Sequence, residues 1–193
     1  MMMLNKEYWE NRYLNQDTGW DTGCITPPLK NYINQLTNKN QKILIPGAGN
    51  GYEFDYLIEN SFNNTFVIDI SPTPISTLHS KHPNHKNQIL LGDFFEHHEK
   101  YDLILEQTFF CAISPNLRKD YAKKMHDLLR PKGKIVGLFF DFPLIEEGPP
   151  FGGSVQEYIA HFSELFEIKT LEKAHNSIKP RSGRELFFIF EKK

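Results

Sequence analysis

Cysteine is scarce in this sequence, and its few cysteines form no recognisable site. Cys24 and Cys111 are the only two cysteines among 193 residues. They lack the spacing of a metal-binding pair, so we expect two buried thiols and neither a disulfide nor redox chemistry. Histidines recur at every third position from 79 to 85, but Pro83 interrupts this run and no carboxylate or cysteine accompanies it at ligand spacing. We therefore expect no metal site.

The sequence also lacks a long hydrophobic run and an excess of positive charge. Residues 1–7 become polar too early for a secretory signal, and no apolar stretch approaches the length of a membrane span. Lys and Arg number 22 against 24 Asp and Glu, a formal net charge of -2. The basic residues are scattered along the chain and form no stripe that would bind a phosphate backbone. We therefore expect a cytoplasmic protein with no membrane and no nucleic-acid partner.

What is present is an alternation of strand-like and helix-like segments, which predicts a parallel sheet with helical crossovers. A length of 193 residues suits one α/β domain, 1–193. Helices are expected to begin where Thr or Ser precedes Pro, at Thr26-Pro27 and Ser71-Pro72. The last two strands are separated only by a polar loop, 176–183, which predicts an antiparallel hairpin. The expected strands are 42–45, 65–70, 88–91, 101–105, 134–140, 166–172 and 185–191.

A glycine-rich loop follows the first strand. Gly47, Gly49 and Gly51 stand between that strand and a helix, where the absence of a Cβ lets a ligand approach the backbone. The third glycine comes one residue too early for the dinucleotide fingerprint. The motif therefore favours a loop beside the methionine end of S-adenosylmethionine (SAM) over a pyrophosphate site. A glycine turn without a ligand is the alternative.

Two carboxylates stand at the ends of the next two strands. Asp69 ends the second strand about twenty residues after the glycines, where it can bind both hydroxyls of a ribose. Asp93 follows the third strand and could accept a hydrogen bond from an adenine amino group, with Phe94 covering the ring. The alternatives are a turn residue at Asp69 and an exposed loop carboxylate at Asp93. The carboxyl ends of parallel strands meet at one edge of the sheet, so we expect a nucleoside site there.

Short motifs along nearly the whole chain point to one protein family. They are YWE at 8–10, TGWDTG at 18–23, TP at 26–27, IPGAGNG at 45–51, FFCAI at 109–113, GPPF at 148–151 and RSGRE at 181–185. With these motifs the chain resembles the thiopurine S-methyltransferase superfamily, and most closely its halide and thiol methyltransferase branch. The resemblance implies SAM as cofactor. It also implies the class I methyltransferase fold, which is α/β and Rossmann-like, with seven strands, mostly parallel, and an antiparallel last strand.

The resemblance implies an N-terminal lid, 1–36, over an α/β core, 37–193. In the lid, aromatic faces could stabilise the sulfonium of the cofactor by a cation–π attraction of about 0.5–2 kcal/mol. An amphipathic helix that buries its aromatic side chains in the core is the alternative. The residues that the resemblance places around the cofactor are Trp9, Tyr13, Trp20, Gly47, Asp69, Asp93, Phe94 and Gln107.

The acceptor implied by the resemblance is a small soft nucleophile: a thiol, hydrosulfide or halide. Such an acceptor arrives already nucleophilic and needs no strong general base. Residues 106–110 accordingly lack the Asn/Asp-Pro-Pro-aromatic signature of amino-group methylation in nucleic acids. No catalytic residue is predicted, and whether Glu106 acts as a base is left open.

A loop over the acceptor is expected at 141–153, where Phe140, Phe142 and Phe151 would form an apolar wall. A plain surface connection is the alternative. Arg181 and Arg184 could attract an anion, and ordinary ion pairs are the alternative for both.

The expected function is therefore methyl transfer from SAM to a small soft nucleophile, by an enzyme that is a monomer or a weak homo-oligomer. A thiopurine-type S-methyltransferase remains an alternative. A nicotinamide-dependent oxidoreductase and a SAM-binding protein without turnover are further alternatives, which fit the sequence motifs less well.

Overall fold

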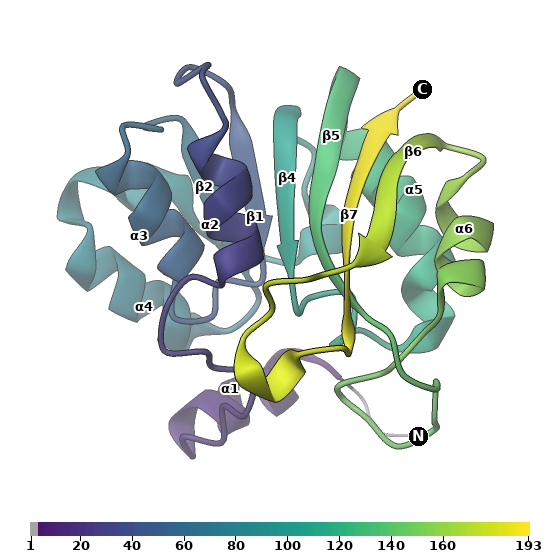
Figure 1. Ribbon diagram of the computed structural model, residues 1–193. Helices are drawn as coiled ribbons and strands as arrows, with labels where there is room; N and C mark the ends of the chain where they lie inside the picture. Colours follow the sequence, from purple (N-terminus) through teal and green to yellow (C-terminus); the bar gives the residue numbers. More distant parts are fainter. Residues whose placement is uncertain (1–3) are drawn as a thin grey trace.

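A seven-stranded sheet with the order β3-β2-β1-β4-β5-β7-β6 forms the centre of the molecule (Figure 1). The computed structural model describes residues 4–193, so residues 1–3 of the expected domain lie outside the described residues. β7 pairs antiparallel with both β5 and β6, and the pairs among β1–β5 are parallel. The predicted closing hairpin and mostly parallel sheet are therefore confirmed. The strands are β1 (Ile43–Pro46), β2 (Thr65–Asp69), β3 (Ile89–Leu91), β4 (Tyr101–Gln107), β5 (Leu129–Phe140), β6 (Phe166–Lys173) and β7 (Glu185–Lys192).

Helices cover both faces of the sheet. Alternate residues of a strand point to opposite faces. In β4, Leu103 and Leu105 accordingly pack in a core with α2, α3 and α4, while Ile104 packs in a second core with α5 and α6. Within residues 4–193 no helix is long and apolar enough to cross a membrane. The helices are α1 (Lys6–Leu14), α2 (Pro27–Asn34), α3 (Tyr52–Glu59), α4 (Pro72–Lys81), α5 (Arg118–Leu128) and α6 (Val155–Phe162), with 3-10 turns η1 (Pro83–Gln88), η2 (Phe94–Glu96), η3 (Pro115–Leu117) and η4 (Lys179–Arg181).

The predicted helix starts are confirmed, because Thr26 and Ser71 occupy the N-cap positions of α2 and α4. Neither side chain makes a capping hydrogen bond to its own helix. The hydroxyl of Thr26 donates to Gln107, and that of Ser71 donates to Glu10. Both N-cap hydroxyls are therefore used to join distant segments of the chain.

The fifth strand begins earlier than expected, at Leu129. Tyr101 pairs with Leu129 and Leu103 with Lys134, so residues between these pairs form a bulge in β5. Lys132 in this bulge has a left-handed φ of 63°. The proline and glycine around it therefore interrupt the ladder locally without ending the strand.

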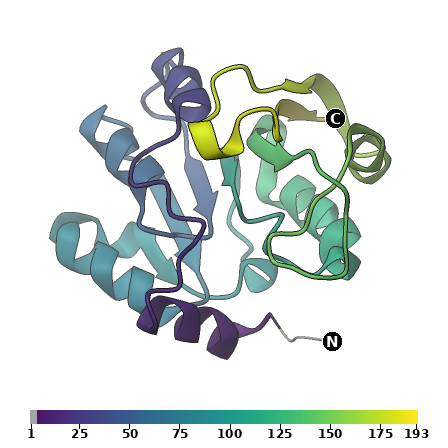
Figure 2. The ribbon, with the colours of Figure 1, turned by 60° about the horizontal axis from the view of Figure 1, so that its bottom comes forward.

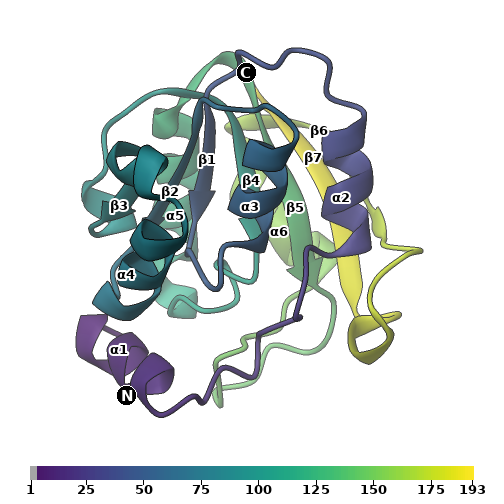
Figure 3. The same ribbon diagram turned by 90° about the vertical axis from the view of Figure 1, so that its left-hand side faces the viewer.

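The carboxyl ends of the parallel strands meet at the lower edge of the sheet in Figure 1. The view from this side shows α1, η4 and the loop after β5 arranged around that edge (Figure 2). A view from the side places α1 beneath α4 (Figure 3). The segments before β1 and after β5 thus come together where open α/β sheets bind ligands.

Gly137 is a position where the sheet tolerates no side chain. A Cβ there would overlap the carbonyl oxygen of Glu106 on the neighbouring β4. We predict that Gly137→Ala lowers the free energy of unfolding by about 3 kcal/mol, because β4 and β5 must separate. Gly92→Ala is the control, since its Cβ would meet only Ile68, at 3.7 Å. Equal midpoints of urea denaturation for the two variants would contradict this.

Candidate functional site

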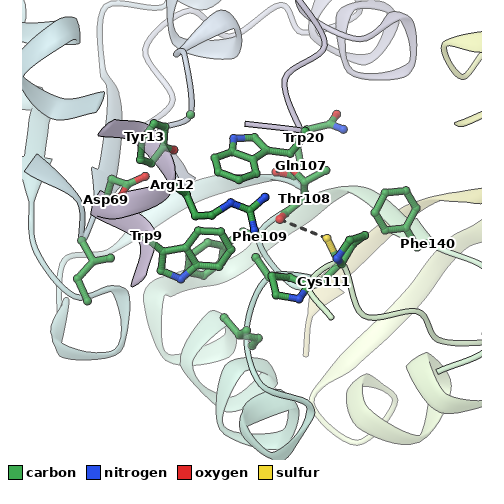
Figure 4. Close-up of a pocket in the computed structure, with 18 of the residues that line it drawn as sticks. Trp9, Arg12, Tyr13, Trp20, Asp69, Gln107, Thr108, Phe109, Cys111 and Phe140 are labelled. Carbon is green, nitrogen blue, oxygen red and sulfur yellow. Dashed lines mark hydrogen bonds between the residues drawn. The ribbon is translucent and has the colours of Figure 1, made fainter. Parts of the chain in front are cut away.

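A cavity of about 310 Å³ opens at the carboxyl edge of the sheet (Figure 4). Its wall comes from α1 and the segment that follows it, from the ends of β1, β2, β4 and β5, and from η4. A smaller cavity of about 40 Å³ adjoins it beside the glycine loop. The volume of the larger cavity is in the range of small-molecule sites. The residues singled out from the sequence that lie in its wall are Trp9, Tyr13, Trp20, Gly47, Asp69, Gln107, Phe140 and Arg181.

The glycine loop owes its shape to close packing. Gly47 has a φ of 76°, and a Cβ there would lie 2.9 Å from Cδ2 of Phe109. Gly51 has a φ of 75°, forms the N-cap of α3, and would overlap Leu78 of α4 if it carried a Cβ. The third glycine therefore packs the loop onto α4.

The Asp69 carboxylate joins the glycine loop to the end of β2. Its Oδ2 accepts a hydrogen bond from the Ala48 N–H and its Oδ1 from the Ser71 N–H, each at 2.8 Å. The side chain is buried, with 9% of the residue exposed. Burial raises the pKa of Asp69 to about 6, although hydrogen bonds from the backbone act in the opposite direction. Asp69 thus both fixes the loop and contributes a carboxylate to the cavity wall.

An aromatic group covers the cavity on the side of α1. The Trp20 ring meets the rings of Trp9 and Tyr13 edge to face, with centroids 5.6 and 5.5 Å apart. The Arg12 guanidinium lies 5.3 Å from the Trp20 ring and pairs with exposed Asp17 at 2.9 Å. No residue of α1 is fully buried. The alternative of an amphipathic helix with its aromatic side chains in the core is therefore wrong.

Gln107 presents a hydrogen-bond donor without a partner. The Thr26 hydroxyl, on a residue only 1% exposed, donates to Oε1 of Gln107 at 2.8 Å. Nε2 of Gln107 is buried and has no partner in residues 4–193. Gln107 lines both cavities. An unpaired buried amide is costly, so this group is suited to a ligand with an acceptor atom.

Glu106 lies outside the cavity wall. Its Oε1 accepts hydrogen bonds from the N–H groups of Phe109 and Phe110, at 2.8 and 3.0 Å. Its Oε2 accepts one from the hydroxyl of Tyr121, and the residue is 0% exposed. Burial raises the pKa of Glu106 to about 7. This geometry makes Glu106 the anchor of the loop after β4.

The far side of the cavity is mostly apolar. Phe140 and the pair Pro149-Pro150 lie there together with Cys111, whose Sγ donates to the Thr108 carbonyl at 3.3 Å. Burial raises the pKa of Cys111, so this thiol stays protonated. Phe140, Pro149, Pro150 and Cys111 therefore supply no group that could accept a proton at neutral pH.

Arg181 brings a positive charge to this side. Its Nη2 donates to the Trp20 carbonyl at 2.7 Å, and its Nη1 lies 3.4 Å from Oε1 of Glu185. Its guanidinium lies 5.7 Å from the centre of the Phe140 ring. Arg181 thus joins η4 to the aromatic cover while lining the cavity.

Five residues expected at the site do not line the larger cavity. Exposed Asp93 caps η2 by accepting a hydrogen bond from the Phe95 N–H at 2.8 Å. Phe94 is buried and packs against Phe109 with ring centroids 5.2 Å apart. Phe151 is also buried, and its N–H donates to the Cys111 carbonyl at 2.8 Å. Phe94 and Phe151 thus support wall residues from behind.

Arg184, the fourth, is exposed, and its guanidinium lies 4.6 Å from the ring centre of Phe142. Phe142 is the fifth, because it also lies outside the wall. Arg12 and Thr108 are wall residues that the sequence reasoning missed. Arg12 could have been found, because it lies three residues after Trp9 on the same helix face.

Two remaining expectations concern thiols and metals. Cys111 is buried as expected, but Cys24 is exposed, so that part of the expectation is wrong. Cys24 lies in the irregular segment between α1 and α2, which no core element covers. Within residues 4–193 no group of three or more His, Cys, Asp or Glu side chains is arranged to hold a metal ion.

Known proteins match this chain in sequence and in fold. A model of the thiopurine S-methyltransferase (TPMT) family matches residues 4–192. A probable thiol methyltransferase 2 from Arabidopsis thaliana is 34% identical over 184 residues, covering 92% of this chain and 81% of that protein. Thiocyanate methyltransferase 1 from Brassica oleracea is 28% identical, with the same coverage of 92% and 81%.

A solved structure shares the fold. It is the 1,6-didemethyltoxoflavin-N1-methyltransferase from Burkholderia thailandensis, with bound S-adenosylhomocysteine. The similarity has a TM-score of 0.74 at 16% identity and covers 97% of this chain and 87% of that one. The predicted class I fold is therefore confirmed.

The anchoring role of Glu106 predicts how substitutions act. Glu106→Leu leaves the N–H groups of Phe109 and Phe110 and the Tyr121 hydroxyl without their acceptor, so we expect the free energy of unfolding to fall by about 3 kcal/mol. Glu106→Gln keeps an acceptor for both groups and should cost less than about 1 kcal/mol. Urea denaturation followed by circular dichroism measures both. Equal stability of the two variants would show that Glu106 does not hold the loop.

Proposed function

Because the chain belongs to the thiopurine S-methyltransferase family, we propose that it methylates a small soft nucleophile that arrives as an anion. The enzyme is a SAM-dependent methyltransferase, which agrees with the resemblance seen in the sequence. The observation that carries the proposed acceptor is the absence of an available base in the wall of the larger cavity. Among residues 4–193, that wall contains no His or Glu, and its carboxylate, Asp69, has each oxygen bonded to a backbone N–H.

The residues present fit SAM. The glycine loop has two positions that a Cβ would fill, and Gln107 offers an unpaired buried donor beside it. We propose that Asp69 binds the ribose and that Gln107 and Gly47 face the methionine end. Trp9, Tyr13 and Trp20 would surround the sulfonium. Asp93 and Phe94 are proposed for the adenine end on the resemblance alone.

When bound, SAM supplies an electrophilic methyl group on a sulfonium. The work left to the chain is to attract, align and desolvate the acceptor. The guanidinium groups of Arg12 and Arg181 in the wall favour an anion. Phe140 and Pro149 would hold it in apolar surroundings, where a soft anion keeps little of its hydration. We propose the loop 141–153, with Phe151 behind the wall and Arg184 at its outer side, as the acceptor side.

Thiols, hydrosulfide and halides are the acceptors that this cavity suits best. A larger thiopurine is the second candidate, supported by the family to which the chain belongs. The two relatives described above are a probable thiol and a thiocyanate methyltransferase, which supports the smaller acceptors. An oxidoreductase and a binding protein without turnover are not favoured.

The remaining proposals concern organisation and partners. We propose a single domain, 1–193, with a lid at 1–36 and a core at 37–193. The net charge of -2 supports a protein that acts without nucleic acid. We further propose a monomer or weak homo-oligomer in the cytoplasm.

Binding of S-adenosylhomocysteine should depend on the ionisation of Asp69. The carboxylate must be charged to accept bonds from two hydroxyls, and its pKa is raised to about 6. Affinity should therefore fall about tenfold for each pH unit below 6. Asp69→Asn should raise the dissociation constant by about ten- to a hundredfold.

Isothermal titration between pH 5 and 8 measures both effects. The control is Asp120→Asn, an exposed carboxylate on α5. A pH-independent affinity, or an Asp69→Asn variant that binds like wild type, would remove Asp69 from the cofactor site.

The proposed acceptor chemistry predicts how the rate depends on pH. Without a protein base, the rate with a thiol should rise through the pKa of that thiol, because only the thiolate reacts. Initial rates with two thiols of different pKa, with saturating SAM, provide the test. A break at one shared pH for both thiols would show that a group of the enzyme removes the proton.

A further inference from the structure

Helix α1 is held in place by a carboxylate. No residue of α1 is fully buried, and the hydrogen bonds that join it to the start of α4 all go to Glu10. Oε2 of Glu10 accepts hydrogen bonds from the Ser71 hydroxyl and from the Thr73 N–H, the latter at 3.1 Å. Oε1 accepts one from the Thr73 hydroxyl at 2.6 Å. All these donors lie at the N-terminus of α4, below which α1 is seen in Figure 3.

The first turn of α4 explains why a carboxylate binds there. Pro72 and Pro74 have no N–H, so Thr73 carries the free amide among the first three residues of the helix. Ser71, at the N-cap, makes no side-chain bond to its own helix. A negative charge is also favoured at a helix N-terminus. Glu10 therefore supplies, from another helix, the cap that α4 lacks.

Glu10 is ionised at neutral pH. Burial opposes the charged form, but hydrogen bonds from Ser71 and Thr73 outweigh it, so the pKa of Glu10 is lowered. A charged acceptor makes stronger hydrogen bonds than a neutral one.

Ser71 connects this cap to the proposed cofactor site. Its hydroxyl donates to Glu10, while its N–H donates to Asp69 at 2.8 Å. On α1, Trp9 directly precedes Glu10 and Tyr13 follows it by three residues, and both line the cavity. The same short segment therefore fixes the carboxylate on one side of the cavity and the aromatic cover on the other.

We propose that Glu10 is a positioning residue that holds the aromatic lid, Trp9, Tyr13 and Trp20, over the cofactor by capping α4. The proposal rests on the proposed cofactor site. Glu10 acts through α1 and touches no ligand. Loss of its charge frees the lid to open more often, so bound cofactor leaves faster.

The test compares two glutamates of the same helix. Glu10→Gln removes the charge and one acceptor, whereas Glu7→Gln changes an exposed side chain in the first turn of α1. The two tryptophans of the chain, Trp9 and Trp20, both lie in the lid, so tryptophan fluorescence reports on the lid alone. Stopped-flow fluorescence with S-adenosylhomocysteine then gives its association and release rates.

We expect Glu10→Gln to speed release about tenfold, because the hydrogen bonds to a charged acceptor are lost. The association rate should change less than about twofold. Glu7→Gln should behave like wild type. Thr73→Val should also speed release, and combining it with Glu10→Gln should add less than the sum of the single effects, because both weaken the same set of hydrogen bonds. Unchanged release in Glu10→Gln, or fully additive effects, would overturn the proposal.

A measurement without ligand separates this proposal from the proposed function. Acrylamide quenching of the tryptophans in the free protein should increase in Glu10→Gln and not in Glu7→Gln. Failure of wild type to bind S-adenosylhomocysteine would contradict the proposed function, while the quenching would still decide whether Glu10 holds the lid. Equal quenching in the two variants would overturn the role of Glu10.

Discussion

The Asp69 carboxylate, bonded on one side to the Ala48 N–H and on the other to the Ser71 N–H, is the interaction on which the site depends. Through Ala48 it sets the glycine loop, whose conformation also requires that Gly47 and Gly51 lack a Cβ. Through Ser71 it reaches the start of α4, where the Ser71 hydroxyl donates to Glu10 of α1. One buried carboxylate at the end of β2 therefore links the sheet, the loop and α1, and its burial is what raises its pKa to about 6.

The same geometry limits the chemistry. Asp69 and Glu106 are committed to structure, and Cys111 is protonated at neutral pH. Glu106 was a candidate base in the sequence, but its Oε1 accepts hydrogen bonds from the loop after β4, its Oε2 accepts one from Tyr121 on α5, and the residue lies outside the cavity wall. What the wall offers an acceptor is positive charge from two guanidinium groups and apolar surface. Such surroundings favour a nucleophile that brings its own charge.

The fold and the centre of the site could be predicted because their signals are local. Gly47 follows a buried strand and Asp69 ends the next one, and parallel topology brings strand ends together whatever the side chains do. The direction in which a loop side chain points cannot be predicted from the neighbouring residues in the sequence. In the structure Asp93 caps η2, and Phe151 packs behind Cys111. Arg181 lines the cavity while Arg184 does not, although both belong to one motif, because the turn at η4 directs them differently. The bulge that extends β5 depends on pairing with β4, which the residues around Lys132 do not reveal.

The central claim is that this enzyme methylates only acceptors that arrive already nucleophilic. The most direct measurement is a methyl-transfer assay with SAM across iodide, thiocyanate, hydrosulfide, two small thiols and a thiopurine, alongside amines and alcohols of matched size. Headspace gas chromatography and mass spectrometry identify the methylated products. Turnover of the soft anions, with no product from the amines and alcohols, is the predicted result. Methylation of an amine or alcohol at a rate comparable to that of a thiol would contradict the account, because such an acceptor needs a base that the described cavity wall does not contain.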